Sequence, residues 1–276
     1  MFKKHLEINN YSDRTIELYL NDLKDFYNFI QEYNNLTFKD VTRTEVLQFL
    51  YYLNDKGIKT TTRHHKFFAV KSFYKWYRGK HPMIDPTYSV ESGKIAKRIP
   101  KTLTFNQAKD LVDVYENLKY KMLIKMFLNT GLRVSEVCNI RLEDVDMSNC
   151  CLNVKCKGNR TRQVNFTTKL SNELKIYCSK FQPINYLFES YKGKQYSRRR
   201  VHEIVSEAYK ELGLKGFTVH SLRHTVATML YENTKDIKLV KEFLGHESIE
   251  STIIYTHVNN EILKEAVKRN PLNEEV

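Results

Sequence analysis

The sequence predicts a mainly α-helical protein of two domains, with a small β-hairpin or sheet in the second domain. Along most of the chain, apolar residues recur at spacings of three and four, the period of helices buried on one face. A segment containing prolines, 81–102, lacks this period and separates the first third from the rest. Two strand-like runs, 151–156 and 161–166, flank a turn and predict the hairpin.

The first third of the sequence predicts three helices. The first helix has an apolar face from Ile16 to Ile30, and Ser12 stands where an N-cap residue belongs. The second helix covers 43–53, and the third covers 60–77. The third helix carries lysines and arginines between its apolar positions. We expect it to lie against phosphates, or to be an ordinary surface helix with extended lysines.

The remainder of the chain predicts helices on both sides of the hairpin. These predicted helices cover 104–116, 118–129, 198–212, 221–231, 237–243, 248–256 and 260–269. A basic linker at 94–101 is expected to join an N-terminal domain, 1–93, to a second domain, 102–276.

The charge distribution indicates a polyanionic partner. The 276-residue chain has a formal net charge of +13. Residues 51–100 hold 11 basic against 3 acidic residues, and residues 151–200 hold 12 against 2. Two separate basic segments favour a nucleic acid gripped from two sides. General basicity from a lysine-rich composition is the alternative.

Other features argue against several classes of protein. No run approaches the roughly 18 apolar residues of a membrane span, and no apolar signal segment follows Met1. Five cysteines, none in a Cys-x-x-Cys pair, suit neither zinc spacing nor a disulfide framework. We therefore expect a reduced, cytoplasmic protein.

A first short segment suits phosphate binding. It reads Thr130-Gly131-Leu132-Arg133-Val134-Ser135-Glu136. Arg133 falls where one helix ends and another begins, so its guanidinium and the helix N-terminal N–H groups could converge on one phosphate. An ordinary arginine at a helix start is the alternative.

A second segment combines charge with a proton carrier. It reads His220-Ser221-Leu222-Arg223-His224. The spacing lets His220, Arg223 and His224 share one face of a helix. At a scissile phosphate, the arginine would supply positive charge and a histidine would carry a proton. A zinc site on the two histidines is the alternative, which the neighbouring guanidinium and the missing glutamate disfavour.

A third segment reads Leu244-Gly245-His246-Glu247-Ser248. Its glycine turn places His246 before a helix that Ser248 would cap, and Tyr255 would lie on that helix. By itself Tyr255 is unremarkable, because the chain has 18 tyrosines.

In this order and spacing, the three segments and Tyr255-x-His257 resemble the tyrosine recombinases, which include phage integrases, transposon integrases and Xer-type resolvases. The resemblance covers essentially the whole chain. Residues 1–93 look like the family's helical core-binding (SAM-like) domain, and 102–276 look like its catalytic domain with a C-terminal exchange helix. It implies a two-domain clamp around DNA.

The resemblance also implies a catalytic set. Its members here are Arg133, Lys157, His220, Arg223, His246 and the nucleophile Tyr255. Glu136 has a supporting role. Cys156 stands where relatives often have glycine, which leaves Lys155 open as the hairpin lysine. His220 is the candidate general base, and the final destination of the proton stays open.

The reaction implied by the resemblance is site-specific recombination. Tyr255 would attack the scissile phosphate and form a 3′-phosphotyrosine link, while Lys157 protonates the departing 5′-oxygen. Four protomers on two duplexes would exchange strands through a Holliday junction, without metal, ATP or another cofactor. The expected partner is double-stranded DNA with a short inverted-repeat core site. The helix over 260–269 would dock into a neighbouring protomer or pack against its own.

Basic side chains near the expected DNA surface are candidate phosphate contacts. They are Arg63, Lys66, Lys71, Lys75, Lys97, Arg98, Arg160, Arg162, Arg198, Arg199 and Arg200. Two alternatives share the basic surface: a type IB topoisomerase with the same chemistry, and a DNA-binding protein without catalysis. A metal nuclease would need an acidic cluster at the site, which the motifs lack. The biological role among integration, excision, inversion, transposition and dimer resolution is left open.

Overall fold

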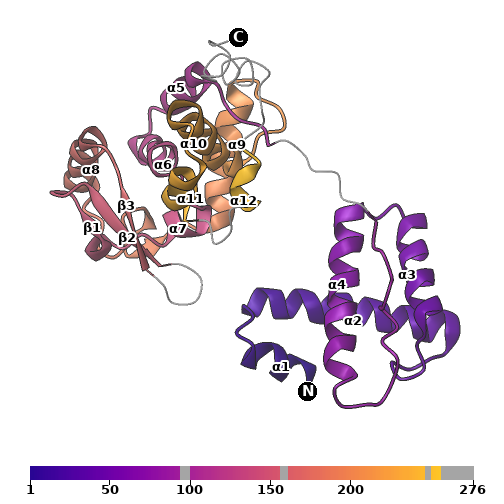
Figure 1. The fold of residues 1–276 in the computed structure, drawn as a ribbon. Helices are drawn as coiled ribbons and strands as arrows, with labels where there is room; N and C mark the ends of the chain where they lie inside the picture. The colour runs from indigo at the N-terminus through magenta and orange to yellow at the C-terminus, as the bar shows by residue number, and fades with distance from the viewer. Residues whose placement is uncertain (94–99, 156–160, 246–249, 256–276) are drawn as a thin grey trace, which may run out of the picture. The chain divides into compact units, whose positions relative to one another are not determined.

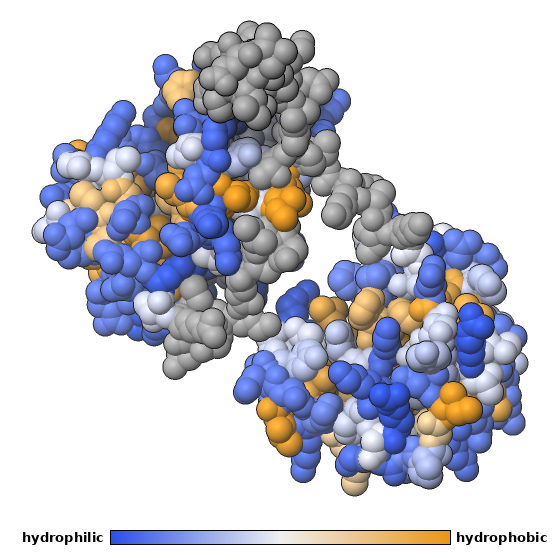
Figure 2. Space-filling view, viewed as in Figure 1, coloured by the Kyte–Doolittle hydropathy of each residue, from blue (hydrophilic) through white to orange (hydrophobic). Residues whose placement is uncertain are grey.

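The chain folds into two compact units, Met1–Arg98 and Ile99–Val276. The residues that the computed structural model describes are 1–93, 100–155, 161–245 and 250–255. Each unit has its own hydrophobic core. Hydrophilic residues cover most of the visible face of both units, and apolar residues reach it only in smaller groups (Figure 2).

The described part of the N-terminal unit contains four helices. They are α1 (Phe2–Ile8), α2 (Asp13–Asn34), α3 (Arg43–Asp55) and α4 (Thr60–Tyr77). Helices α2 and α4 pack along each other, and α1 and α3 each contact both. Phe26, Phe49 and Tyr74 are fully buried between them, and the Phe26 ring packs edge-on against the other two. These large rings give a small unit a substantial apolar core.

Capping residues define where these helices begin and end. Ser12 accepts a hydrogen bond from the Thr15 N–H at 3.3 Å, so the predicted N-cap is confirmed. Thr42 and Glu45 form a capping box at the start of α3. Such caps satisfy N–H groups that have no partner within the helix, each contributing about 1 kcal/mol.

The described part of the second unit contains eight helices (Figure 1). They are α5 (Phe105–Asp113), α6 (Leu118–Thr130), α7 (Val134–Cys138), α8 (Thr168–Phe181), α9 (Arg198–Glu211), α10 (Val219–Thr234), α11 (Ile237–Leu244) and α12 (Glu250–Ile253). Helix α6 contacts α5, α8 and α10, and α10 also contacts α9 and α11. Ile124 and Phe127 of α6 and Leu222 of α10 are fully buried. The helix that carries the second sequence segment therefore runs through the middle of the unit.

A three-stranded antiparallel sheet flanks these helices. Its order is β1 (Val145–Asp146), β2 (Cys151–Lys155), β3 (Thr161–Asn165), and a 3₁₀ helix, Leu142–Asp144, precedes it. Val154 on β2 is directly opposite Arg162 on β3. Directly opposed residues share a face of the sheet, so Arg162 lies on the buried face beside Val154. A second, two-stranded sheet pairs β4 (Glu189–Tyr191) with β5 (Lys194–Gln195).

The predicted fold class, mainly helical with small antiparallel sheets, is confirmed. The helix predicted over 60–77 coincides with α4, and the predicted hairpin corresponds to β2 and β3. Helix α8 lies outside every predicted element, although its buried Leu170, Leu174 and Tyr177 have helical spacing.

One prediction about the C-terminal region is wrong. The helix expected over 248–256 ends at Ile253 in the described residues, and Tyr255 lies in the turn that follows. Its N–H donates to the Thr252 carbonyl at 3.0 Å. Most of the expected linker, 94–101, and the whole expected helix, 260–269, lie outside the described residues. No helix in the described part is long and apolar enough to cross a membrane.

Candidate active site

The turn between α6 and α7 positions Arg133. Gly131 ends α6 in the left-handed conformation, with φ of +60°. A Cβ at this position would meet Cδ2 of Leu244 at 2.9 Å. Glycine therefore satisfies both the backbone conformation and the close approach to the end of α11. Two residues later, Arg133 becomes the N-cap residue of α7, with its side chain 41% exposed.

Glu136 holds two arginines together. Its carboxylate accepts hydrogen bonds from the Arg133 backbone N–H at 2.7 Å and from Arg133 Nη1 at 3.0 Å. Arg162 of β3 donates to both carboxylate oxygens, from Nη1 at 3.0 Å and from Nη2 at 3.2 Å. The Glu136 side chain is only 7% exposed. Bidentate pairing restricts both groups, so Glu136 orients Arg133 and joins it to the hairpin.

The charge state of Glu136 follows from these bonds. Burial alone would raise its pKa, but the hydrogen bonds from Arg162 and Arg133 outweigh burial and hold the pKa below its usual value. The ionised carboxylate neutralises one of the two guanidinium charges. The cluster as a whole therefore stays positive, as a phosphate site requires.

Arg223 connects the turns of the first and third sequence segments. It is 6% exposed; its Nη1 donates to the Gly131 carbonyl at 2.6 Å and its Nη2 to the Leu244 carbonyl at 2.8 Å. Burial, followed by the positive charge of Arg133, lowers the pKa of Arg223 to about 10, so it stays charged at neutral pH. A guanidinium has five N–H donors, and these two bonds leave others for a phosphate.

His220 lies one helical turn before Arg223, at the start of α10. Its ring centroid is 6.1 Å from that of His202 on α9. Loss of hydration, followed by the electrostatic effects of His202, Arg223 and Arg133, lowers the pKa of His220. His220 is therefore neutral at pH 7, the form that can accept a proton.

Tyr255 is buried next to α10. The residue is 6% exposed and belongs to a small apolar cluster with Ala227, Val240 and Leu244. Its hydroxyl lies 2.9 Å from Nδ1 of His224. Burial raises the pKa of Tyr255, and the charges of Arg223 and Arg133 oppose that rise. The phenol is therefore protonated before reaction and has a hydrogen-bond partner on α10.

His224 is absent from the predicted catalytic set. The signal that could have identified it is its position on the helical face shared with His220 and Arg223. Several predicted site residues lie outside the described part of the chain: Lys97, Arg98, Lys157, Arg160 and His246. Among the residues that the structure describes, no three His, Cys, Asp or Glu side chains are arranged to hold a metal ion.

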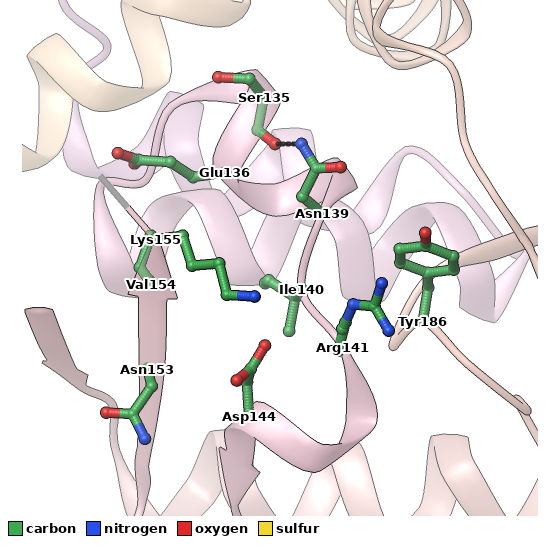
Figure 3. A pocket seen from close by; sticks show the side chains of 10 residues that line it. All are labelled: Ser135, Glu136, Asn139, Ile140, Arg141, Asp144, Asn153, Val154, Lys155 and Tyr186. Atoms are coloured by element: carbon green, nitrogen blue, oxygen red, sulfur yellow. Dashed lines mark hydrogen bonds between the residues drawn. The ribbon is translucent and has the colours of Figure 1, made fainter. Parts of the chain in front are cut away.

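A polar pocket of about 350 Å³ lies beside α7 and the end of β2. Lys155 extends into it toward Asp144, whereas the Glu136 carboxylate points the other way (Figure 3). Neither Arg223 nor Tyr255 lines this pocket. Lys155 therefore points into this pocket, while Lys157, the other candidate lysine, lies outside the described residues.

The four candidate DNA contacts on α4 differ in their availability. Lys66 forms ion pairs with two aspartates of α2, and its side chain is 13% exposed. Arg63 donates hydrogen bonds to the end of α3 and to the loop after it. Lys71 and Lys75 are exposed. The two exposed lysines are therefore better placed to contact phosphates than Lys66, whose charge is already compensated.

The candidate DNA contacts of the second unit also differ in whether their side chains are available to a phosphate. Arg162 is directed inward, onto Glu136. On α9, Arg198 and Arg199 are exposed, and Arg199 pairs with Glu203 while its side chain stays 90% exposed. Arg200 pairs with the same glutamate and with another one turn further on. Exposed ion pairs of this kind are weak, so these arginines can exchange their partners for phosphates.

The chain matches two family models. Residues 1–82 match the N-terminal SAM-like domain of phage integrases, and residues 101–261 match the phage integrase family. The tyrosine recombinase XerC of Roseiflexus sp. (strain RS-1) is 30% identical over 292 residues, covering 100% of this chain and 93% of the relative.

Two solved structures share the fold. The XerH site-specific recombinase bound to palindromic difH substrate, in a post-cleavage complex, aligns with a TM-score of 0.77 and 22% identity, covering 92% of this chain and 79% of the other. A lambda integrase tetramer bound to a Holliday junction aligns with a TM-score of 0.73 and 18% identity, covering 91% and 74%.

The helical N-terminal unit and the matched catalytic unit together define a DNA strand-transferring enzyme. The chain belongs to the phage integrase family, the tyrosine recombinases.

Proposed function

We propose that this recombinase cleaves and rejoins DNA at a specific site through Tyr255, which forms a 3′-phosphotyrosine link. The observation that carries this proposal is the position of the Tyr255 hydroxyl against α10, the helix that also presents His220 and Arg223. Attack on the phosphate forms the bond from the tyrosine oxygen to phosphorus and breaks the bond to the 5′-oxygen. The link preserves the energy of the phosphodiester, so rejoining requires no ATP.

Arg133 and Arg223 are the proposed charge-stabilising residues. The transition state builds negative charge on the non-bridging oxygens of the phosphate, and fixed guanidinium donors stabilise that charge most when they need no rearrangement. The bonds of Arg223 to two backbone carbonyls and of Arg133 to Glu136 supply that rigidity. Two arginines can supply the charge that other enzymes take from a metal ion, so we expect no divalent cation to be required.

Three further groups complete the proposed chemistry. His220 is neutral at pH 7 and is the base that the sequence motif suggests. Lys157 would protonate the leaving 5′-oxygen, and His246 would donate a hydrogen bond to the phosphate. The last two residues lie outside the described part of the chain, so their roles rest on the motif.

We propose a homotetramer on two DNA duplexes as the active assembly, with a Holliday junction as intermediate. The lambda integrase tetramer bound to a Holliday junction supports this by shared fold. An apolar groove of about 480 Å³, lined by Phe105, Leu128, Met229 and Phe243, crosses α5, α6, α10 and α11. On the basis of its apolar sequence pattern, we propose that the segment Ile262-Leu263-x-x-Ala266-Val267 of a second copy occupies this groove.

The proposed target is double-stranded DNA with a short inverted-repeat core site, contacted through Lys71, Lys75 and the exposed arginines of α9. Because its substrate is DNA, we place the enzyme in the cytoplasm. The relatives are described as tyrosine recombinases XerC and XerD and as the XerH site-specific recombinase, which favours recombination over DNA relaxation.

Covalent capture tests the proposal. Purified protein is mixed with fragmented genomic DNA in EDTA and stopped with SDS, and protein-linked fragments are sequenced beside a Tyr255→Phe control. We expect one inverted-repeat site to be enriched by the wild type and lost in the variant. Equal adducts from both proteins would contradict the role of Tyr255. Relaxed plasmid without recombinant product from the captured site would indicate a topoisomerase instead.

A further inference from the structure

A polar atom of His224 lies close to the hydroxyl of the proposed nucleophile. Its Nδ1 lies 2.9 Å from the Tyr255 hydroxyl, and the two ring centroids are 5.6 Å apart. The histidine is half-buried on α10, directly after Arg223. The site therefore contains a second histidine, in contact with the reacting oxygen, to which the motif assigns no function.

Packing alone does not account for this contact. The Tyr255 ring is already held by Ala227, Val240 and Leu244, which any apolar ring could contact equally well. The hydroxyl is placed against an imidazole nitrogen, the side-chain group best suited to accept a proton near neutral pH. His220, one turn earlier, places its ring beside His202 on α9. His224 is the histidine in hydrogen-bond contact with the phenol, so it takes over the role of base that the motif alone suggests for His220.

We propose that His224 is a catalytic residue whose Nδ1 accepts the phenolic proton when Tyr255 attacks the phosphate. This inference rests on the proposed role of Tyr255 as nucleophile. During cleavage, the tyrosine oxygen bonds to phosphorus, its proton moves to Nδ1, and the released 5′-oxygen takes a proton from the general acid. During rejoining, the 5′-hydroxyl attacks, the tyrosine oxygen leaves, and His224 returns the proton.

The surrounding charges favour the neutral imidazole that this role needs. Burial, followed by the electrostatic effects of His220 and of the Arg223 guanidinium, lowers the pKa of His224. From outside α10, Arg133 at the start of α7 acts on Tyr255 and opposes the effect of burial on the phenol. These positive charges disfavour an imidazolium in the resting enzyme. An arriving phosphate would offset them at the moment when the proton is transferred.

A DNA-free measurement tests the hydrogen bond. Nitrogen-15 NMR of the full chain, with histidines labelled, reports which ring nitrogen of His224 carries the proton at pH 7.5; His224→Gln assigns the signal. We expect Nε2 to be protonated and Nδ1 to be the acceptor, with a shift of Nδ1 in Tyr255→Phe. A neutral ring protonated at Nδ1 would overturn the proposal, because that nitrogen could not accept the phenolic proton.

The rate of adduct formation then tests the proton transfer. Two duplexes carry the captured site: one has the natural 5′-bridging oxygen at the cleaved bond, and the other has a 5′-bridging sulfur. A thiolate needs no proton in order to leave, so the sulfur substrate removes the need for the general acid. We expect His224→Gln to slow adduct formation by about 100-fold or more with both substrates. Lys157→Ala should form the adduct slowly on the oxygen substrate and at nearly the wild-type rate on the sulfur substrate.

Chemical rescue distinguishes proton transfer from structural support. Imidazole added to His224→Ala should restore adduct formation by at least about tenfold, with a rate that follows the neutral form of imidazole. Rates within twofold of wild type for His224→Gln, or faster than wild type, would overturn the inference. If Tyr255→Phe still formed adducts at the wild-type rate, the proposed function would fail instead, so the two failures are distinguishable.

Discussion

Arg223 shows why a buried charge is retained at this site. Two backbone carbonyls, those of Gly131 and Leu244, accept hydrogen bonds from its guanidinium. These bonds compensate the burial of the guanidinium, because a buried charge without hydrogen bonds is strongly destabilising. The same planar guanidinium holds the turn after α6 and the turn after α11 at a fixed distance from each other. The residue therefore has a structural role in addition to its proposed role at the phosphate.

We expect Arg223→Lys to lose both roles although the charge is kept. A single ammonium cannot donate in two fixed directions with the geometry of a guanidinium. The free energy of unfolding should fall by about 2 kcal/mol, measured by urea denaturation. Adduct formation should fall by about 100-fold. A lysine variant with wild-type stability would show that the two carbonyl bonds contribute little.

The two histidines of α10 predict how the reaction depends on pH. The pKa values of His220 and His224 are both lowered from the usual 6.5, so each ring is neutral at pH 7 and gains a proton only in acid. Adduct formation should therefore be flat near neutrality and fall below pH 6.5. Single-turnover rates between pH 5 and 8 measure this. A rate that rises toward pH 5.5 would contradict a neutral base.

The free energy of unfolding should also decrease as the pH falls. Unfolded histidines bind protons near pH 6.5, whereas the folded rings bind them only at lower pH. The unfolded state therefore holds more protons in this window, and the free energy of unfolding falls as the pH drops through 6.5.

At the scale of elements, the turn after α11 depends on a glycine. Gly245 has φ of +65°, and a Cβ there would meet Nε of Arg162 at 2.6 Å and its Cδ at 2.7 Å. The end of α11 and the hairpin thus approach each other so closely that no side chain fits. Gly213 offers a matched comparison, because its φ is +66° but nothing lies within 4 Å of an added Cβ.

We expect Gly213→Ala to cost about 1 kcal/mol, the penalty of the left-handed backbone alone. Gly245→Ala should cost about 1–3 kcal/mol more, because Arg162 must move. It should also slow adduct formation, since the displaced guanidinium is the one that holds Glu136. Urea denaturation of both variants measures the difference. Equal destabilisation would mean that Arg162 moves aside freely.

Arg162 joins the hairpin to the site through Glu136. A variant can test whether Arg162 positions Glu136 or contacts a DNA phosphate. If Arg162 positions Glu136, Arg162→Gln should reduce the adduct rate by about 100-fold and leave the salt dependence of DNA binding unchanged. If it contacts a phosphate, the slope of log K against log salt should fall by about 1. Arg199→Ala is the control, because this exposed arginine should change the slope but not the rate.

For the whole molecule, assembly is proposed to depend on the apolar groove of the second unit. A charge in the groove should prevent docking of an apolar helix from another copy. We expect Met229→Glu to abolish complexes larger than two protomers on DNA, measured by sedimentation, while binding of single protomers persists. Ile176→Glu is the control, since Ile176 lies on α8, is 64% exposed and does not line the groove. Tetramers formed by Met229→Glu would exclude this groove.

Family membership and the fold class follow from the sequence alone. Helical periods, capping residues and glycine turns act locally, so the helix over 60–77 and the hairpin could be predicted in place. Local patterns are less informative for short or weakly apolar elements. The helix α12 ends before Tyr255 because the residue instead packs in a turn against α10, a contact between segments far apart in sequence.

The sequence by itself determined which residue types could perform the chemistry, because their spacing along three short segments is a local property. Only the tertiary structure decided which of them meet. The register of β2 and β3 directs Arg162 inward onto Glu136, although its charge alone suggested a DNA contact. The packing of α10 brings His224 to Tyr255, 31 positions further along the chain. Such pairs depend on how elements pack, and that information is absent from any single segment.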